Sequence, residues 1–305
     1  MILAVDLGGT KIEAALVDLD GTVMPGSRAR RATGSAIDAE HLRASIIEVV
    51  DAALTLLPAG TTLQGAGIGS AGPVSLDAGE VMPINMPGIG RFALRETVAE
   101  RVHRVFPGAP VRLRHDGTCI ALAESWVGAA RGHGSSVSLV VSTGIGAGII
   151  VAGRPVVGAT GNAGHIGQTR IALTPDEGGG QTLEDVASGP NTVAWAQAQG
   201  WPGTSGEALA RDAAAGDPLA RAAAERSARA VGAVLANVVT LLDIDIAVIA
   251  GGFVNVVPNY AELAEAAMRE RAVLGYARAA RVVRSPLGDE GPLTGAAALI
   301  ALDVT

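Results

Sequence analysis

The chain has 305 residues, of which 49% are hydrophobic and 3% aromatic, and its 23 basic and 30 acidic residues give a net charge of −7. This acidic balance argues against nucleic acid or an anionic membrane as the main partner. The single cysteine, Cys119, excludes an intramolecular disulfide and any metal site built on several cysteines. Neither a signal peptide nor a membrane-spanning stretch is expected, so the composition predicts a soluble, cytoplasmic α/β protein of one large or two ordinary domains.

A glycine-containing hairpin opens the chain and recurs later. Residues 3–23, LAVDLGGTKIEAALVDLDGTV, predict a strand, a glycine turn, a second strand, a turn at Asp20-Gly21 and a third strand. Residues 139–157, LVVSTGIGAGIIVAGRPVV, repeat this order, with Ser142 between the first strand and the glycines. The repeat favours a duplicated architecture with two similar domains; the alternative is a chance likeness between two common glycine hairpins.

Hydrophobic periodicity predicts the remaining elements. Helices are expected at residues 37–57, with Ser35 as the cap, and at 92–106, 117–130, 217–242, 260–273 and 294–302. Strands are expected around residues 65–74, 111–116 and 245–253, and an irregular stretch at 158–190. GIGSAG, at residues 67–72, matches a dinucleotide-binding pattern, but Pro73 and a turn follow it rather than a helix, so we interpret it as a tight turn.

Three segments place glycines at the ends of expected strands: DLGGTK, STGIGAG and IAGGF. Such turns can present backbone N–H groups as anion-binding nests, and two nests that face each other across a cleft could hold the phosphates of a nucleotide. In this interpretation Asp6 holds a magnesium ion through water, and Thr10 and Lys11 reach the phosphates. The simpler interpretation of each segment alone is a hairpin turn.

Taken together, these segments resemble ROK-type sugar kinases, a family within the actin- and hexokinase-like superfamily of ATPases. VDLGGTK resembles the first phosphate loop of the family, VSTGIGAGI the second, and AGGF the loop near the adenosine. MPINMPG, RHDGTCIALAE and TLEDVASG resemble its sugar-binding Pro-Asn segment, its catalytic-base segment and its segment with a sugar-binding glutamate. The likeness extends over nearly the whole chain, in the expected order.

The resemblance implies an ATP- and magnesium-dependent phosphotransferase that acts on a sugar hydroxyl. Phosphoryl transfer to an alcohol needs a base beside the hydroxyl, and Asp116 is the expected base, although an Asp at such a position is by itself more often a helix cap. The expected nucleotide-binding residues are Asp6, Gly8, Gly9, Thr10, Lys11, Thr143, Gly144, Gly251 and Gly252. The expected acceptor-binding residues are Asn85, His115, Asp116, His165, Gln168 and Glu184. The alternatives are a turn residue for Asn85 and a surface helix residue for Glu184.

The sequence departs from the family pattern beside the expected acceptor site. In AGHIGQT, His165 takes the place of a sugar-binding Glu and Gln168 that of a His that also binds zinc. The next segment, RIALTPDEGGGQTLE, lacks the zinc-binding cysteines of the family, so no zinc is expected. His115 replaces the Asn that usually precedes the base. These changes bear on the acceptor more than on the reaction.

The expected acceptor follows from His165, for which the alternative role is a hydrogen-bonded loop histidine without substrate contact. A neutral imidazole offers one donor, one acceptor and a flat ring, which suits the carbonyl and methyl of an N-acetyl group. AGHIGQT also resembles the AGHIGH stretch of bacterial N-acetylmannosamine kinases, and this resemblance makes N-acetylmannosamine the leading candidate, with a C7 cyclitol or glucose as alternatives. An alternative of another class is a non-catalytic, sugar-sensing ROK protein; ROK repressors carry an N-terminal helix-turn-helix, for which a strand that starts at Ile2 leaves no room.

The fold implied by the resemblance is α/β, with two actin/hexokinase-like (ribonuclease H-like) domains whose mixed sheets close on a cleft. The first domain is expected at residues 1–116 plus about 291–305, and the second at 117–290. The resemblance also implies a homodimer.

Overall fold

The computed structural model describes residues 1–171 and 181–304 and divides into two compact units. Unit 1 comprises Met1–Gly128, Pro155–Ala163 and Asp289–Thr305, and unit 2 comprises Ala129–Arg154 and Gly164–Gly288. The sequence placed the first boundary at Asp116, whereas unit 1 continues to Gly128. The reason is that the helix after Asp116 packs on the C-terminal helix of unit 1. No helix within the described residues is long and apolar enough to cross a membrane.

Unit 1 is built on a five-stranded mixed sheet with the order β3-β2-β1-β4-β7. Its strands are β1 (Ile2–Leu7), β2 (Lys11–Val17), β3 (Ala29–Ala32), β4 (Ala66–Ser70) and β7 (Val111–His115); β5 (Val74–Ser75) and β6 (Glu80–Val81) form a small separate pair. The helices are α1 (Ala39–Thr55), α2 (Leu94–Val105), α3 (Asp116–Trp126) and α10 (Gly291–Ala301). β1 runs antiparallel to β2 and parallel to β4, which is parallel to β7.

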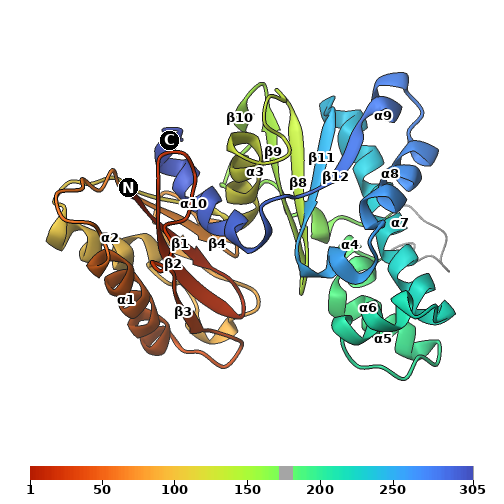
Figure 1. Ribbon diagram of the computed structural model, residues 1–305, viewed down its shortest axis with the longest axis horizontal. Coiled ribbons are helices and arrows are strands. Elements are labelled where there is room, and N and C mark those ends of the chain that lie inside the picture. Colours follow the sequence, from red (N-terminus) through yellow and green to blue (C-terminus); the bar gives the residue numbers. More distant parts are fainter. Residues whose placement is uncertain (172–180, 305) are drawn as a thin grey trace. The chain divides into compact units, whose positions relative to one another are not determined.

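The alternation of side chains along β1 assigns the two faces of this sheet. Leu3, Val5 and Leu7 pack in the cluster that holds the buried faces of α1 and α2, whereas Ile2 and Ala4 pack with α10. Figure 1 shows α1 and α2 on one side of this sheet and α10 on the other. Because successive side chains of a strand alternate, Asp6 lies on the same face as Ile2 and Ala4. This register directs the carboxylate away from the larger apolar cluster.

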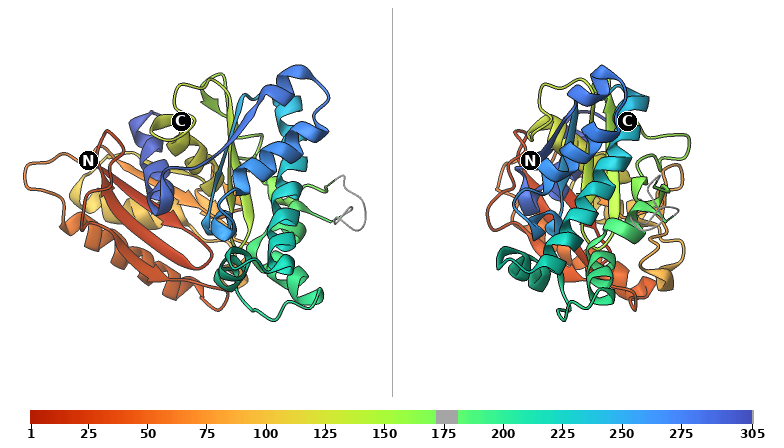
Figure 2. Two further views of the ribbon diagram at one scale, coloured as in Figure 1. Left: turned by 45° about the vertical axis from the view of Figure 1, so that its right-hand side comes forward. Right: turned by 90° about the vertical axis from the view of Figure 1, so that its right-hand side faces the viewer.

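Unit 2 contains a second five-stranded sheet with the order β10-β9-β8-β11-β12. Its strands are β8 (Ser136–Val141), β9 (Ile145–Val151), β10 (Arg154–Pro155), β11 (Ile246–Ala250) and β12 (Arg281–Arg284). Its helices are α4 (Leu183–Ala187), α5 (Gly189–Ala198), α6 (Gly206–Ala214), α7 (Pro218–Leu242), α8 (Tyr260–Arg271) and α9 (Gly275–Ala279). α7 and α8 pack side by side (Figure 2), where a Cβ at Gly232 would lie 2.8 Å from that of Ala267.

The predicted duplication is confirmed, because both sheets have the same strand order. In each, an antiparallel hairpin leads into parallel strands. Two local predictions were wrong. The third strand of the first unit is Ala29–Ala32, and the segment after the Asp20-Gly21 turn makes only an isolated bridge between Val17 and Val23. The cap of α1 is Asp38 rather than Ser35, since the Asp38 side chain accepts a hydrogen bond from the N–H of His41.

Candidate active site

The first glycine loop, residues 8–10, joins β1 to β2 and is held in place by backbone and side-chain bonds. The N–H of Gly8 donates to the carbonyl of Lys11 at 2.9 Å, and Thr33 Oγ1 donates to the carbonyl of Gly8 at 3.1 Å. The Gly8 N–H is therefore engaged in the hairpin. An anion at this loop would meet the N–H groups that follow Gly8.

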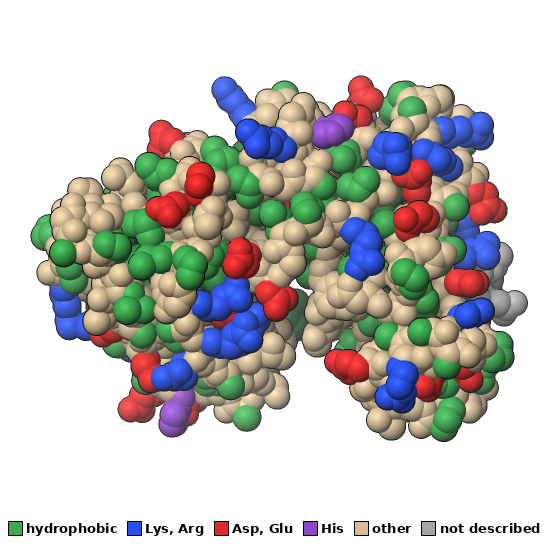
Figure 3. Space-filling view, in the orientation of Figure 1, with side chains coloured by type: hydrophobic (Ala, Val, Ile, Leu, Met, Phe, Trp, Pro, Cys, Tyr) green, Lys and Arg blue, Asp and Glu red, His purple; other side chains and the backbone are tan. Residues whose placement is uncertain are grey.

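Lys11, at the end of this loop, belongs to a cluster of cations around one buried carboxylate. Glu13 is only 2% exposed and forms ion pairs with Lys11, with Arg28 at 3.4 Å and with Arg30 at 2.7 Å. Lys and Arg side chains gather over β2 and β3 in Figure 3. Three cations around one carboxylate leave net positive charge beside the loop, as a site for phosphates requires.

Asp6, predicted to hold magnesium through water, and Asp116, predicted as the catalytic base, both lie in unit 1. Asp6 is 8% exposed, and burial, together with the nearby carboxylates of Asp116 and Glu13, raises its pKa to about 7. Asp116 begins α3 directly after β7, and its side chain is 41% exposed. The predicted start of this helix at Gly117 differs by one residue.

These carboxylates suit a magnesium ion. A divalent cation would supply the positive charge that buried Asp6 lacks, and Mg²⁺ is usually held by one or two carboxylates, several waters and substrate phosphates. Within residues 1–171 and 181–304, no group of three or more His, Cys, Asp or Glu side chains forms a protein-only metal site. A magnesium ion at Asp6 would therefore take its remaining ligands from water and from substrate phosphates.

His115 and Gly117 fix the orientation of Asp116. Asp116 Oδ1 accepts the backbone N–H of Gly117 at 2.7 Å and lies 3.1 Å from Nε2 of His115. The imidazole of His115 is only 4% exposed. This burial and this contact suit a role for His115 in orienting Asp116, and the predicted acceptor contact of His115 stays a prediction.

Asn85, the predicted acceptor-binding residue of unit 1, lies against the first glycine loop. It follows exposed Ile84 in a segment that is tied back by a bond from the Ile84 N–H to the carbonyl of Gly72 at 3.3 Å. A Cβ built on Gly9 would lie 2.6 Å from Cγ of Asn85, and closer still to Nδ2. The Asn85 amide therefore packs against the backbone of Gly9, in the space that a side chain at residue 9 would occupy.

The second glycine loop, residues 142–144, holds the predicted acceptor-binding glutamate of unit 2. Glu184 lies in the first turn of α4, which Thr182 caps. Its Oε2 accepts the N–H of Ile145 at 2.7 Å, and its Oε1 accepts the amide of Gln168 at 3.2 Å. A Cβ at Gly144 would lie 2.7 Å from Oε2. Glu184 is thus fixed by the glycine loop on one side and by Gln168 on the other.

His165 lies in a short segment that is pinned to β9. The N–H of Ala147 donates to the carbonyl of Gly164 at 2.9 Å, and a Cβ at Gly164 would lie 2.9 Å from the carbonyl carbon of Ala147. A Cβ at Gly167 would lie 3.1 Å from the carbonyl carbon of Ile145. The two glycines therefore bring His165 and Gln168 close to the second glycine loop. The cysteine-free segment used to argue against zinc falls largely at residues 172–180, outside the described residues.

A pocket of about 560 Å³ opens beside the second glycine loop within unit 2. Gly251 turns the chain there with φ +105°, where a Cβ would lie 2.8 Å from the carbonyl carbon of Val141, so only glycine fits. The N–H of Gly189, at the start of α5, donates to the carbonyl of Ser142 at 2.8 Å. The pocket walls come from the loop, α5, α6 and the turn after β11, and include Thr143, Pro190, Val193, Ser205, Glu207, Gly252, Phe253 and Asn255.

Most of these pocket residues were missed from the sequence. Only Thr143 and Gly252 had been predicted, because they lie in glycine motifs. The sequence signal that could have located this wall of the pocket was the Ser205-Gly206-Glu207 run, because serine is a preferred helix cap. In the structure Ser205 caps α6 by accepting the N–H of Ala208 at 3.2 Å.

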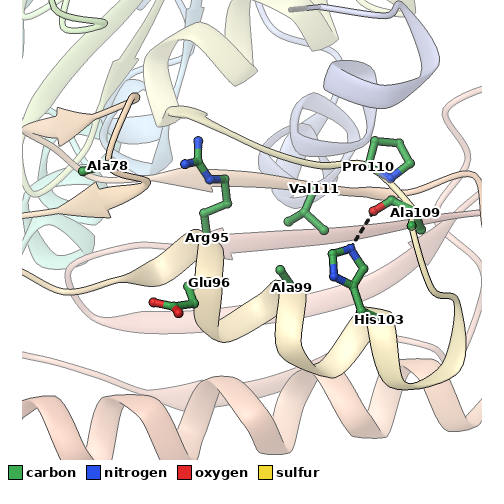
Figure 4. Close-up of a pocket in the computed structure, with 9 residues that line it drawn as sticks. Ala78, Arg95, Glu96, Ala99, His103, Ala109, Pro110 and Val111 are labelled. Atoms are coloured by element: carbon green, nitrogen blue, oxygen red, sulfur yellow. Dashed lines mark hydrogen bonds between the residues drawn. The ribbon is translucent and has the colours of Figure 1, made fainter.

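A second hollow, of about 510 Å³, lies in unit 1 between α2 and the start of β7 (Figure 4). Two of its polar side chains, His103 and Arg95, are engaged with backbone carbonyls. His103 Nε2 lies 2.9 Å from the carbonyl oxygen of Ala109, and the Arg95 guanidinium donates to the carbonyls of Leu76 and Asp77 at 2.8 and 3.0 Å. It offers little to recognise a ligand.

Comparison with known proteins agrees with a phosphotransferase of the sugar-kinase type. The ROK family model matches residues 2–302, so the chain belongs to the ROK family. It is 29% identical, over 99% of its length and all of the relative, to an N-acetyl-D-glucosamine kinase of Citrobacter koseri. Among solved structures it resembles a ROK hexokinase from Thermus thermophilus, with 32% identity, TM-score 0.81 and coverage of 99% and 98% of the two chains. A ROK glucokinase from Streptomyces griseus, in complex with glucose and AMPPNP, shows 29% identity, TM-score 0.80 and coverage of 98% of each chain.

Proposed function

We propose that this chain is an ATP-dependent sugar kinase that transfers the γ-phosphate to a hydroxyl of an N-acetylhexosamine. The observation that carries the proposal is the arrangement around Asp116. Its Oδ1 is fixed by Gly117 and His115, its side chain is 41% exposed, and its carboxylate lies close enough to Asp6 to contribute to the raised pKa of Asp6. Such a carboxylate has the fixed orientation and the solvent access that a general base requires.

In the proposed reaction the acceptor hydroxyl donates its proton to Oδ2 of Asp116 while its oxygen attacks the γ-phosphorus. The bond to the β,γ-bridging oxygen breaks, and ADP leaves. Asp6 would hold a magnesium ion through water, and such an ion would supply positive charge to neutralise the phosphates. Lys11 and the arginines around Glu13 add positive charge at the first glycine loop. Water must be kept from the transferred group, otherwise ATP is hydrolysed instead.

The pocket of unit 2 suits the nucleoside part of ATP. Its apolar walls, Val193 and Phe253, can cover a base, and the polar side chains of Ser205, Glu207 and Asn255 can accept or donate hydrogen bonds to ribose and base. The adjoining loop at Thr143 and Gly144 would then meet the phosphates.

Two observations support an N-acetylhexosamine as the acceptor. The relatives of Citrobacter and other bacteria are named N-acetyl-D-glucosamine kinases. In this chain the carbonyl of His165 accepts the N–H of Gln168 at 3.0 Å, and the Gln168 amide bonds to Glu184. The His165 imidazole can donate to an acetyl carbonyl while its ring covers the methyl. N-acetylmannosamine and N-acetylglucosamine are both acceptors of this class; glucose and a C7 cyclitol are the competing acceptors.

The test is an ADP-release assay with the full chain, ATP and Mg²⁺ across these four acceptors. We expect kcat/KM for at least one N-acetylhexosamine to exceed that for glucose about tenfold or more, because one polar mismatch in a site costs on the order of 1–3 kcal/mol. His165→Glu should reduce this preference. A native preference for glucose or the cyclitol would contradict the acceptor assignment, and sugar binding without ADP release from any acceptor would favour a non-catalytic sensor.

A further inference from the structure

Two glycines at the phosphate loops share a feature that phosphate binding does not explain. Gly9 and Gly144 both lack the left-handed φ values found at many other glycines of the chain, so their backbones could be adopted by alanine. The need for glycine at these positions must therefore come from the space around them.

In each loop that space is filled by a predicted acceptor-binding side chain. At Gly9 the atoms nearest to a Cβ belong to the Asn85 amide, and at Gly144 they belong to the Glu184 carboxylate, at 2.7 Å for Oε2. Glu184 also accepts the N–H of Ile145, so it is tied to the loop by a hydrogen bond as well as by contact. Gly8, the neighbour of Gly9, differs: a Cβ there would meet only the carbonyl oxygen of Lys11, at an ordinary 3.5 Å.

We propose that Gly9 and Gly144 are positioning residues for the sugar acceptor: each leaves room for an acceptor-binding side chain to rest on a phosphate loop. This inference builds on the proposed function. In each unit, one loop would then contribute to the binding of both substrates. The loop backbone would face the nucleotide phosphates, and the glycine would leave room for Asn85 or Glu184 to pack against the loop. The acceptor-binding groups are thereby held at a fixed distance from the loops that hold the phosphates.

The proposal predicts an unusual effect of adding one methyl group. In Gly9→Ala and Gly144→Ala the methyl meets the far end of a flexible side chain rather than backbone, so the fold should survive while Asn85 or Glu184 is displaced. A purely phosphate-binding role for these glycines would instead raise the KM for ATP.

The experiment compares the KM for the best acceptor and for ATP in Gly9→Ala, Gly144→Ala and two controls. Gly8→Ala is the control within the loop, where acceptor KM should not rise. Gly275→Ala, at the start of α9 with open space around it, controls for the substitution itself. We expect acceptor KM to rise about tenfold or more in Gly9→Ala and Gly144→Ala, with ATP KM changed less than about threefold. A rise confined to ATP KM, or no rise in either, would overturn the proposal.

Double variants separate this mechanism from general damage to the loops. Once Asn85→Ala has removed the amide, the methyl of Gly9→Ala has nothing to displace, so the second substitution should add no further rise in acceptor KM; Glu184→Ala and Gly144→Ala should behave alike. Additive effects would contradict positioning through these side chains. If Asn85→Ala and Glu184→Ala themselves leave acceptor KM unchanged, the acceptor site of the proposed function is wrong.

Binding without turnover gives an independent readout. Calorimetric titration of the acceptor sugar into Gly9→Ala, without nucleotide, should show weakened binding, with the unfolding temperature close to that of the native chain. Native-like sugar affinity in a folded Gly9→Ala variant would contradict the proposal.

Discussion

The two glycine hairpins occupy the same place in two sheets of the same order, yet they carry different chemistry. In the first, Asp6 and Glu13 are paired across the hairpin, and both are buried. In the second, Val140 is paired with Gly146, and the loop offers Ser142 and Thr143 instead of charge. The shared topology therefore accounts only for the positions of the two loops, and the chemical difference between them comes from their side chains.

In the proposed function, unit 1 supplies the carboxylates for the chemical step and for magnesium, and unit 2 supplies the pocket for the nucleoside. Asp6, Asp116 and the cations around Glu13 lie in unit 1. The large pocket beside the glycine loop lies in unit 2, as does Glu184 with its Gln168 contact. Under the proposed function, variants of Asp6 and Asp116 in unit 1 should mainly change the chemical step, and variants of the unit 2 pocket should mainly change nucleotide binding.

The largest effect is expected for Asp116→Asn. The amide keeps its size and can still accept the Gly117 N–H, but it cannot take up a proton, so kcat should fall about 10²-fold or more. ATP affinity, measured by calorimetry, should stay close to native because the proposed nucleoside pocket lies in unit 2. Asp217→Asn, the same change at the cap of α7, is the matched control. Near-native turnover in folded Asp116→Asn would exclude Asp116 as the base.

The second prediction concerns the stability of unit 1 as a function of pH. The folded pKa of Asp6, about 7, lies above its ordinary value of 3.8. The contribution of Asp6 to the free energy of unfolding is therefore fully present below about pH 4, where the carboxyl is protonated, and is lost as pH rises through 7. In magnesium-free buffer, Asp6→Asn should therefore gain stability relative to the native chain between pH 4 and pH 8, by roughly 2–4 kcal/mol. Denaturant unfolding at several pH values measures this gain.

The control for that experiment is Asp18→Asn, which changes an exposed carboxylate just beyond β2. A difference between Asp6→Asn and the native chain that does not vary with pH would show that Asp6 ionises normally in the folded state. Mg²⁺ together with a nucleotide should reduce the advantage of Asp6→Asn, because the cation stabilises the ionised carboxylate.

The third prediction tests the nucleotide role of unit 2. Ala210 lines the pocket from α6, and Ala210→Trp should fill it and raise the KM for ATP about tenfold, with a smaller change in kcat. Ala214→Trp, at an exposed position of the same helix, is the matched control and should leave ATP KM unchanged. Equal ATP KM values for the two variants would place the nucleoside elsewhere.

A smaller effect is expected for Gln168→Leu. This change removes the donor to Glu184 Oε1 but leaves the bond from the Ile145 N–H, so Glu184 is loosened rather than lost. Acceptor KM should rise roughly threefold to tenfold, in line with one hydrogen bond. Gln199→Leu, at an exposed glutamine of unit 2, provides the comparison. If both variants bind the acceptor equally well, Gln168 does not hold Glu184 for substrate binding.

The smallest expected signal is the zinc content, for which we propose a value near zero. The sequence lacks the thiolates and the histidine that such a site uses in this family, and Gln168 is engaged with Glu184. Elemental analysis of the purified chain should find no stoichiometric zinc. One tightly bound zinc per chain would require a different set of ligands.

Much of the fold could be predicted from local patterns. Glycine turns between apolar runs and helical periodicity depend on neighbours within a few residues, so both hairpins, most helices and the family were evident without coordinates. The wrong predictions concern segments whose structure depends on contacts with residues that are distant in the sequence. Ala29–Ala32 became the third strand because it pairs with β2, and α3 joined unit 1 because it packs on α10.

The candidate site shows the same limit. The sequence alone determined the candidate residues for the chemistry, since Asp6, Asp116 and Glu184 stand in recognisable motifs. Only the tertiary structure decided their environments: the burial that raises the pKa of Asp6, the contact of His115 with Asp116, and the contact of Asn85 with Gly9. These properties arise between segments that are distant in sequence or depend on burial, and desolvation, charge and close contact act through space rather than along the chain.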